Sequence, residues 1–182
     1  GRRAQDHIPQ ATGAPGSINW DRARSVAISM NRESLLTEHE RRRLDSEYHD
    51  LVQQTIPLVA DFTGASLPFP LDKIYTFDRV DWIEANLRSF QHMFEPIERL
   101  NLLGGSDSSR PANAVWNGLN QTVVSSELGL LLGYLARRVL GQYDLALLGR
   151  EPLTESGKLY FVQPNIRNLE TSLHVPPQQF RL

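Results

Sequence analysis

ELGLLLGYLARRVLGQYD, residues 127–144, joins a long apolar run to two adjacent arginines and a glycine stop. The hydrophobic pattern predicts a helix over about residues 120–140. Residues 128–135 are apolar nearly all round, so we expect this helix to be buried at the centre of the fold. Gly129 and Gly133 each cost about 1 kcal/mol relative to alanine in a helix interior. We therefore expect them to allow another backbone to approach closely.

Three further amphipathic helices are expected before this stretch, each beginning after a side chain that can cap the first turn. Their expected ranges are from residue 20 to about 30, from 37 to 64, and from 78 to about 104. The second has the capping-box pattern, with Thr37 followed three residues later by Glu40. Pro57 should bend this helix, and Gly64 should end it.

Two short β-prone runs, KIYTF at residues 73–77 and KLYFV at residues 158–162, predict strands. The stretch 104–118 contains Gly, Ser and Pro and is expected to be an exposed loop. Residues 1–17 have almost nothing apolar to bury and are expected to be a flexible lead. The predicted fold is mostly α with a small β-sheet (α+β), formed by residues 18–182.

Composition argues against several classes of function. The chain of 182 residues has 19 basic and 21 acidic side chains, a net charge of −2, which provides no broad field for nucleic acid or anionic membranes. No apolar stretch reaches the roughly 20 residues that a bilayer span needs, and no signal-peptide segment is evident. We expect no nucleic-acid or membrane partner and a cytoplasmic location. The absence of cysteine excludes a thiolate zinc site and a cysteine nucleophile in this chain.

A zinc site in this chain would have to use histidines with carboxylates. The histidines are His7, His39, His49, His92 and His174. No two of them have the i, i+4 spacing that places two imidazoles on one helical face. His39-Glu40 begins like H-E-x-x-H, but the fifth residue is Arg43, so we expect His39 on a solvated face. His92 should be partly buried and hydrogen-bonded. We expect no catalytic residue and no metal ligand in this chain.

Residues 127–144 also carry charged and polar side chains on both sides of the apolar run. Glu127 precedes this run, Arg138 follows it, and Tyr143 and Asp144 come after the glycine stop. A carboxylate and a guanidinium near a core need partners, and an internal ion pair is the simplest structural explanation. The functional alternative is that Glu127, Arg138, Tyr143 and Asp144 line a cleft or orient ligands supplied from elsewhere.

The runs GLLLGYLARRVLGQYD at 129–144, LYFVQPNI at 159–166 and VPPQQFRL at 175–182 resemble the N-terminal half of the zincin-like metallopeptidases. This family was once catalogued as a domain of unknown function, and some members carry a label of deazaflavin-coenzyme biosynthesis. The resemblance covers about residues 18–182 and implies the helical scaffold half of a zincin-like fold. In that family a following helix bears H-E-x-x-H, whose histidines bind zinc and whose Glu activates the metal-bound water.

Pro176–Leu182 is typical of a helix start, so we expect the zinc motif C-terminal to residue 182. The resemblance implies that this chain is the scaffold portion of a zinc-dependent, metallopeptidase-like hydrolase. The complete protein would then be an enzyme that binds zinc and acts on a peptide or protein, whereas this chain alone would do neither. The alternative is a non-enzymatic helical module that binds or scaffolds a protein partner.

Overall fold

The computed structural model describes residues 18–67, 70–71, 73–103, 111–144 and 158–174. These form α1 (Trp20–Ser29), a 3-10 turn η1 (Arg32–Ser34), α2 (Glu38–Thr63), β1 (Lys73–Phe77), α3 (Arg79–Leu103), α4 (Pro111–Ala136), β2 (Gly141–Asp144), β3 (Lys158–Val162) and α5 (Gln163–Leu173). The expected lead at 1–17 and the expected helix start at 176–182 lie outside the described residues. Helices with one small sheet confirm the α+β prediction.

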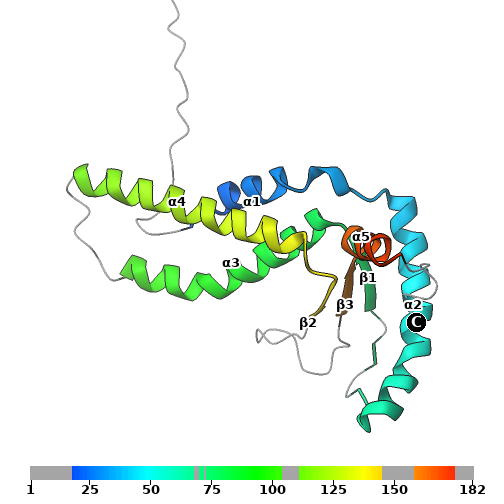
Figure 1. The fold of residues 1–182 in the computed structure, drawn as a ribbon. Helices are drawn as coiled ribbons and strands as arrows, with labels where there is room; N and C mark the ends of the chain where they lie inside the picture. Colours follow the sequence, from blue (N-terminus) through cyan, green and yellow to red (C-terminus); the bar gives the residue numbers. More distant parts are fainter. Residues whose placement is uncertain (1–17, 68–69, 72, 104–110, 145–157, 175–182) are drawn as a thin grey trace, which may run out of the picture.

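The sheet separates two groups of helices (Figure 1). Its strand order is β1-β3-β2, with the central strand β3 parallel to β1 and antiparallel to β2. Helices α1, α3 and α4 pack together on one side of the molecule, and α2 lies against β1 on the other. Helix α5 follows directly from β3. Both strands that the sequence predicts are confirmed, and β2 is an addition.

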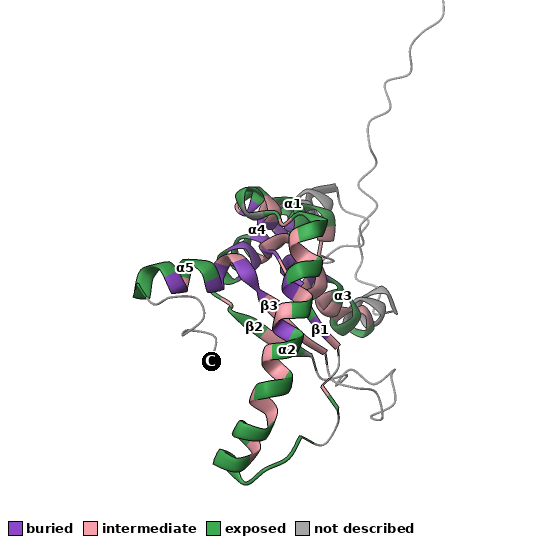
Figure 2. Cartoon of the chain, turned by 90° about the vertical axis from the view of Figure 1, so that its right-hand side faces the viewer, coloured by how far each residue is buried: buried purple, intermediate pink, exposed green. Residues whose placement is uncertain are grey.

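The interior has two apolar clusters, and Figure 2 draws their buried residues in purple. The first lies between α1, α3 and α4 and reaches the end of β3 at Val162. The second joins α2 to the sheet and α5, and its buried members are Leu44, Tyr48, Ile74 and Ile166. The sheet therefore contributes residues to both clusters and connects α1, α3 and α4 on one side to α2 on the other.

Helices α1 and α4 approach each other closely at the two glycines. A Cβ added to Gly129 would lie 2.5 Å from the carbonyl oxygen of Ala23, and one added to Gly133 would lie 3.2 Å from that of Ala27. The buried Asn31 side chain also donates hydrogen bonds to the carbonyls of Ala27 (2.9 Å) and Gly133 (3.1 Å). The expected close approach of another backbone is confirmed, and its partner is α1.

Helix α4 differs from three other expectations. It begins at Pro111, so residues 111–118 are helical and not a loop, and it ends at Ala136 instead of about residue 140. Proline suits the first turn of a helix, because the N–H that it lacks would have no intrahelical partner there. The helix is also not buried all round: Leu132 is 2% exposed, but Leu131 is 54% exposed. An apolar face is buried only where a neighbour covers it, and the face opposite α1 has none among the described residues.

The local helix signals are confirmed. Asn19 accepts a hydrogen bond from the backbone N–H of Arg22 and caps α1. Thr37 and Glu40 form the predicted capping box of α2, and Gly64 ends this helix in the left-handed conformation at φ 67°. Each motif depends on residues within four positions of one another, which is why the sequence predicts them well.

The capping box makes stability depend on pH. Hydrogen bonds from the Thr37 backbone N–H and hydroxyl lower the pKa of Glu40 below its ordinary value. A carboxyl group whose pKa is lower in the folded state stabilises the fold above the unfolded pKa, about 4.3, and this contribution is lost as pH falls through the folded pKa. Glu40→Gln should therefore reduce the loss of stability between neutral and acidic pH, measured by urea unfolding. Glu38→Gln, outside the capping box, is the control, and an equal effect of both changes would contradict this prediction.

Candidate functional site

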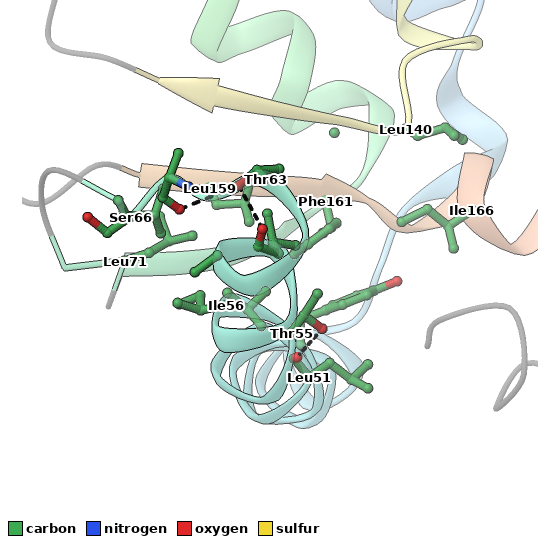
Figure 3. Close-up of a pocket in the computed structure, with 17 residues that line it drawn as sticks. Leu51, Thr55, Ile56, Thr63, Ser66, Leu71, Leu140, Leu159, Phe161 and Ile166 are labelled. Atoms are coloured by element: carbon green, nitrogen blue, oxygen red, sulfur yellow. Dashed lines mark hydrogen bonds between the residues drawn. The ribbon is translucent and has the colours of Figure 1, made fainter.

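A groove of about 640 Å³ lies between α2 and the sheet (Figure 3). Leu51, Thr55 and Ile56 of α2 form one wall, and Leu159 and Phe161 of β3 lie opposite them. The loop after α2, the start of β2 and α5 contribute the remaining lining residues. We call this feature the α2 groove.

Three of the hydroxyl groups that line the α2 groove are bonded within the protein. The hydroxyls of Thr55 and Thr63 donate to carbonyls of their own helix at 2.7 Å. At one end, the buried Tyr48 bonds Gln163 through its hydroxyl and stacks on Phe161, with the ring centroids 4.3 Å apart. None of the described lining residues is His, Asp, Glu, Lys or Arg. The groove therefore suits an apolar occupant better than acid–base or metal chemistry.

A charged cluster joins α2 to β1 and α3, on residues that the sequence analysis did not select together. Arg41 of α2 donates to the carbonyl of Thr76 (2.8 Å) and to Asp81 (2.5 Å), and approaches Asp78 at 3.4 Å. Burial lowers the pKa of Arg41, but the hydrogen bond and charge of Asp81, with the charges of Asp78 and Asp45, outweigh burial and raise it. We call these residues the Arg41 cluster.

The carboxylates of the Arg41 cluster also bind backbone N–H groups. The buried Asp78 accepts from the N–H groups of Leu36 (3.3 Å) and Asp81 (2.9 Å), and Asp45 accepts from Thr76 (2.6 Å). With their oxygens committed to the fold, these carboxylates are suited to fixing three elements relative to one another. We assign the cluster a structural role.

Asn165 forms a second polar junction that sequence reasoning missed. Its amide nitrogen donates to the carbonyls of Ala136 (2.8 Å) and Val139 (2.7 Å), and its oxygen accepts from Arg79 (2.8 Å). Burial, followed by the charge of Arg137, lowers the pKa of Arg79. The buried Asn165 thereby binds the end of α4 to α3 and α5. The run LYFVQPNI contains this residue, but an asparagine after a strand does not by itself indicate whose carbonyls it binds.

The four candidate site residues are divided between α4 and β2. Glu127 is on the exposed face of α4, and the exposed Arg138 lies beyond the helix end, with its guanidinium 4.4 Å from the centre of the Tyr134 ring. Tyr143, 39% exposed, and Asp144 belong to the strand β2 at the edge of the sheet. Glu127, Arg138 and Tyr143 are not among the described lining residues of the α2 groove. The internal ion pair is wrong, because Glu127 and Arg138 both face solvent.

The histidines are dispersed over the surface. His39 is exposed on α2, as expected, but His92 on α3 is also exposed instead of partly buried. His174 ends α5 in the left-handed conformation at φ 54°, and His7 lies outside the described residues. Within the described ranges, no three His, Asp or Glu side chains come together in a way that could hold a metal ion.

Comparisons with known proteins point to one family. The sequence profile of the zincin-like metallopeptidases matches residues 18–182. The crystal structure of a "putative hydrolase with a novel fold" from Chloroflexus aurantiacus is similar, with 34% sequence identity and a TM-score of 0.64. The match covers 91% of this chain and 48% of that one, so this chain spans about half the length of its structural relative. The comparison with curated proteins gives no match. No helix in the described part of the chain is long and apolar enough to cross a membrane.

Proposed function

The chain belongs to the zincin-like metallopeptidase family, and we propose that it is the scaffold portion of a zinc-dependent hydrolase whose zinc motif lies C-terminal to residue 182. The family name supports a peptide or protein as the substrate. The relative from Chloroflexus aurantiacus supports the division into two parts, because 52% of its chain has no counterpart here.

The residues described here do not fit a zinc site. A catalytic zinc takes three protein ligands and keeps one position open for water or substrate. The described histidines are exposed and spread over three helices, and the described part of the chain offers no group of three ligands. We therefore assign no chemical step to Glu127, Arg138, Tyr143 or Asp144, and we propose instead that Tyr143 and Asp144, on β2, border the substrate cleft of the complete hydrolase.

The α2 groove is the observation that carries this proposal. It is bordered by a helix and a sheet, and its described lining offers apolar side chains without an ionisable group other than tyrosine. Large exposed apolar surfaces mark places where another part of a protein packs. The relative has as much chain again as the part that matches, so we propose that an apolar segment of the remaining hydrolase part fills this groove.

Zinc content tests the proposed division. We expect elemental analysis of the complete parent protein to give about one zinc per chain, and that of the 182-residue chain to give none. Changing the histidines of this chain singly to alanine should leave the zinc content of the complete protein unchanged. Stoichiometric zinc on the 182-residue chain, lost when one of its own histidines is changed, would show that the proposal is wrong.

A pair of substitutions on α2 tests the groove separately. Ile56 lines the groove, whereas Leu58 is 65% exposed and does not line it. Ile56→Glu should lower the melting temperature of the complete protein much more than that of the 182-residue chain, because only the former would bury the carboxylate. Leu58→Glu should have a small effect in both. Equal effects of Ile56→Glu in the two proteins would mean that the remaining part does not occupy the groove.

A further inference from the structure

Helix α4 presents an apolar stripe to solvent on the face opposite α1. Its members are Val123, Val124, Leu130, Leu131, Tyr134 and Leu135, which are 37–54% exposed. Since successive residues of a helix are turned by about 100°, these six share one face with Glu127 at its middle. Ser125, Gly129 and Leu132, which are buried, lie on the opposite face. We call this surface the α4 stripe.

The stripe continues beyond the end of the helix to Arg138. The N–H groups of Arg137 and Arg138 still donate to the carbonyls of Tyr134 (3.2 Å) and Leu135 (2.8 Å), so the chain makes another turn. This turn places the Arg138 guanidinium over the Tyr134 ring, 4.4 Å from its centre. Four apolar residues of the stripe are thus bounded by a carboxylate on one side and a guanidinium on the other.

The arrangement is symmetric about a point between Leu132 and Gly133. When a second α4 is placed antiparallel to the first about that point, Glu127 of one copy is opposite Arg138 of the other. Leu130 is then opposite Leu135, and Leu131 is opposite Tyr134. A twofold axis repeats each of these contacts, as an isologous dimer interface requires.

We propose that the α4 stripe is a self-association surface whose partner is the same stripe of a second copy of this chain. An apolar partner without a cation would leave Glu127 covered and unpaired, which is unfavourable. In a dimer, the Glu127 of each copy is paired with the Arg138 of the other copy, so both carboxylates have a counter-charge. Specific interfaces bury about 800 Å² per partner, and one pair of helices provides less, so a dissociation constant in the micromolar range is expected. This inference concerns a surface outside the α2 groove and does not rest on the proposed function.

Charge exchange tests the pairing directly. By sedimentation velocity at about 100 µM, the 182-residue chain should be a dimer. Glu127→Arg and Arg138→Glu should each weaken its self-association by about tenfold or more, because each opposes like charges in both contacts. An equimolar mixture of the two variants should dimerise again, since both contacts are then between opposite charges. Leu131→Glu, at the centre of the stripe, should give a monomer.

Arg137→Glu is the matched control, since it makes the same charge change beside the stripe and should leave the dimer intact. Circular dichroism should show that all variants keep their helix content. The proposal is overturned if the wild-type chain is monomeric at this concentration, or if the mixed variants associate no better than each alone. It is also overturned if the complete protein is monomeric while the 182-residue chain dimerises, because the stripe would then be covered by the rest of the protein.

Discussion

Gly129→Ala is expected to lower the free energy of unfolding of the 182-residue chain by about 2 kcal/mol, although alanine is the better helix former. The new Cβ would lie 2.5 Å from the carbonyl oxygen of Ala23, 2.8 Å from the Cβ of Val26 and 3.1 Å from the Cα of Ala23. Two of these contacts are with backbone, so no side-chain rotation can relieve them, and α1 must move away from α4. Overpacking of this kind typically costs about 1–3 kcal/mol or more, and the gain in helix propensity, about 1 kcal/mol, offsets only part of it.

Gly133→Ala is the matched control, because it lies one turn further along the same contact. Its nearest neighbour would be the Met30 sulfur at 2.8 Å, on a flexible side chain, while the Ala27 backbone lies at 3.2 Å or more. The smaller steric conflict and the helix-propensity gain should nearly cancel, leaving a change within about 1 kcal/mol. Urea unfolding of both variants measures the difference. Equal destabilisation would show that the contact of α1 with α4 is not tightest at Gly129.

Asp78→Ala is expected to destabilise the chain by about 3 kcal/mol. Asp78 is 3% exposed. Its carboxylate accepts hydrogen bonds from two backbone N–H groups and faces Arg41. Its removal leaves the N–H groups of Leu36 and Asp81 without this acceptor and takes one counter-charge from a half-buried guanidinium. Breaking a buried ion pair from one side typically costs about 3–5 kcal/mol. The lower end applies because Asp81 still pairs with Arg41.

Two further variants identify the source of that loss. Asp78→Asn keeps an oxygen that can cap the N–H of Asp81 but removes the charge, so we expect about half the effect, measured by urea unfolding. Asp50→Asn, on an exposed side chain of α2, should be within about 0.5 kcal/mol of the wild type. If Asp78→Asn were as stable as the wild type, the charge would contribute nothing and the hydrogen bonds alone would explain the cluster.

The sequence predicts features here when the interacting residues are neighbours in the chain. The capping box of Thr37 and Glu40 and the glycine end at Gly64 depend on contacts of three or four residues. Strand β2 was not predicted, because GQYD has no alternating apolar pattern and is a strand only through its pairing with β3. The composition of residues 104–118 predicts a loop, whereas Pro111 begins a helix.

Burial and the candidate site were harder to predict because they depend on which elements become neighbours. Leu131 and Leu132 are neighbouring leucines in the same apolar run, yet Leu131 is 54% exposed and Leu132 is 2% exposed. The charges of Glu127 and Arg138 favour a buried pair on sequence alone, because the sequence does not indicate that their face of α4 is exposed. The sequence does not indicate that Arg41 pairs with Asp78, because their contact depends on how α2 packs against β1.

The strand pairing of this fold has a consequence for its biosynthesis. Strands β1 and β3 are parallel neighbours although Lys73 and Lys158 are 85 residues apart, and Asn19 bonds Ser125 over 106 residues. Contacts of such separation form slowly in folding. At about 5–20 residues synthesised per second, α1 emerges from the ribosome roughly 5–20 s before its partner α4. Its contact face carries Trp20 and Ile28 beside Ala23 and Ala27, so the nascent helix leaves these apolar side chains uncovered during that interval.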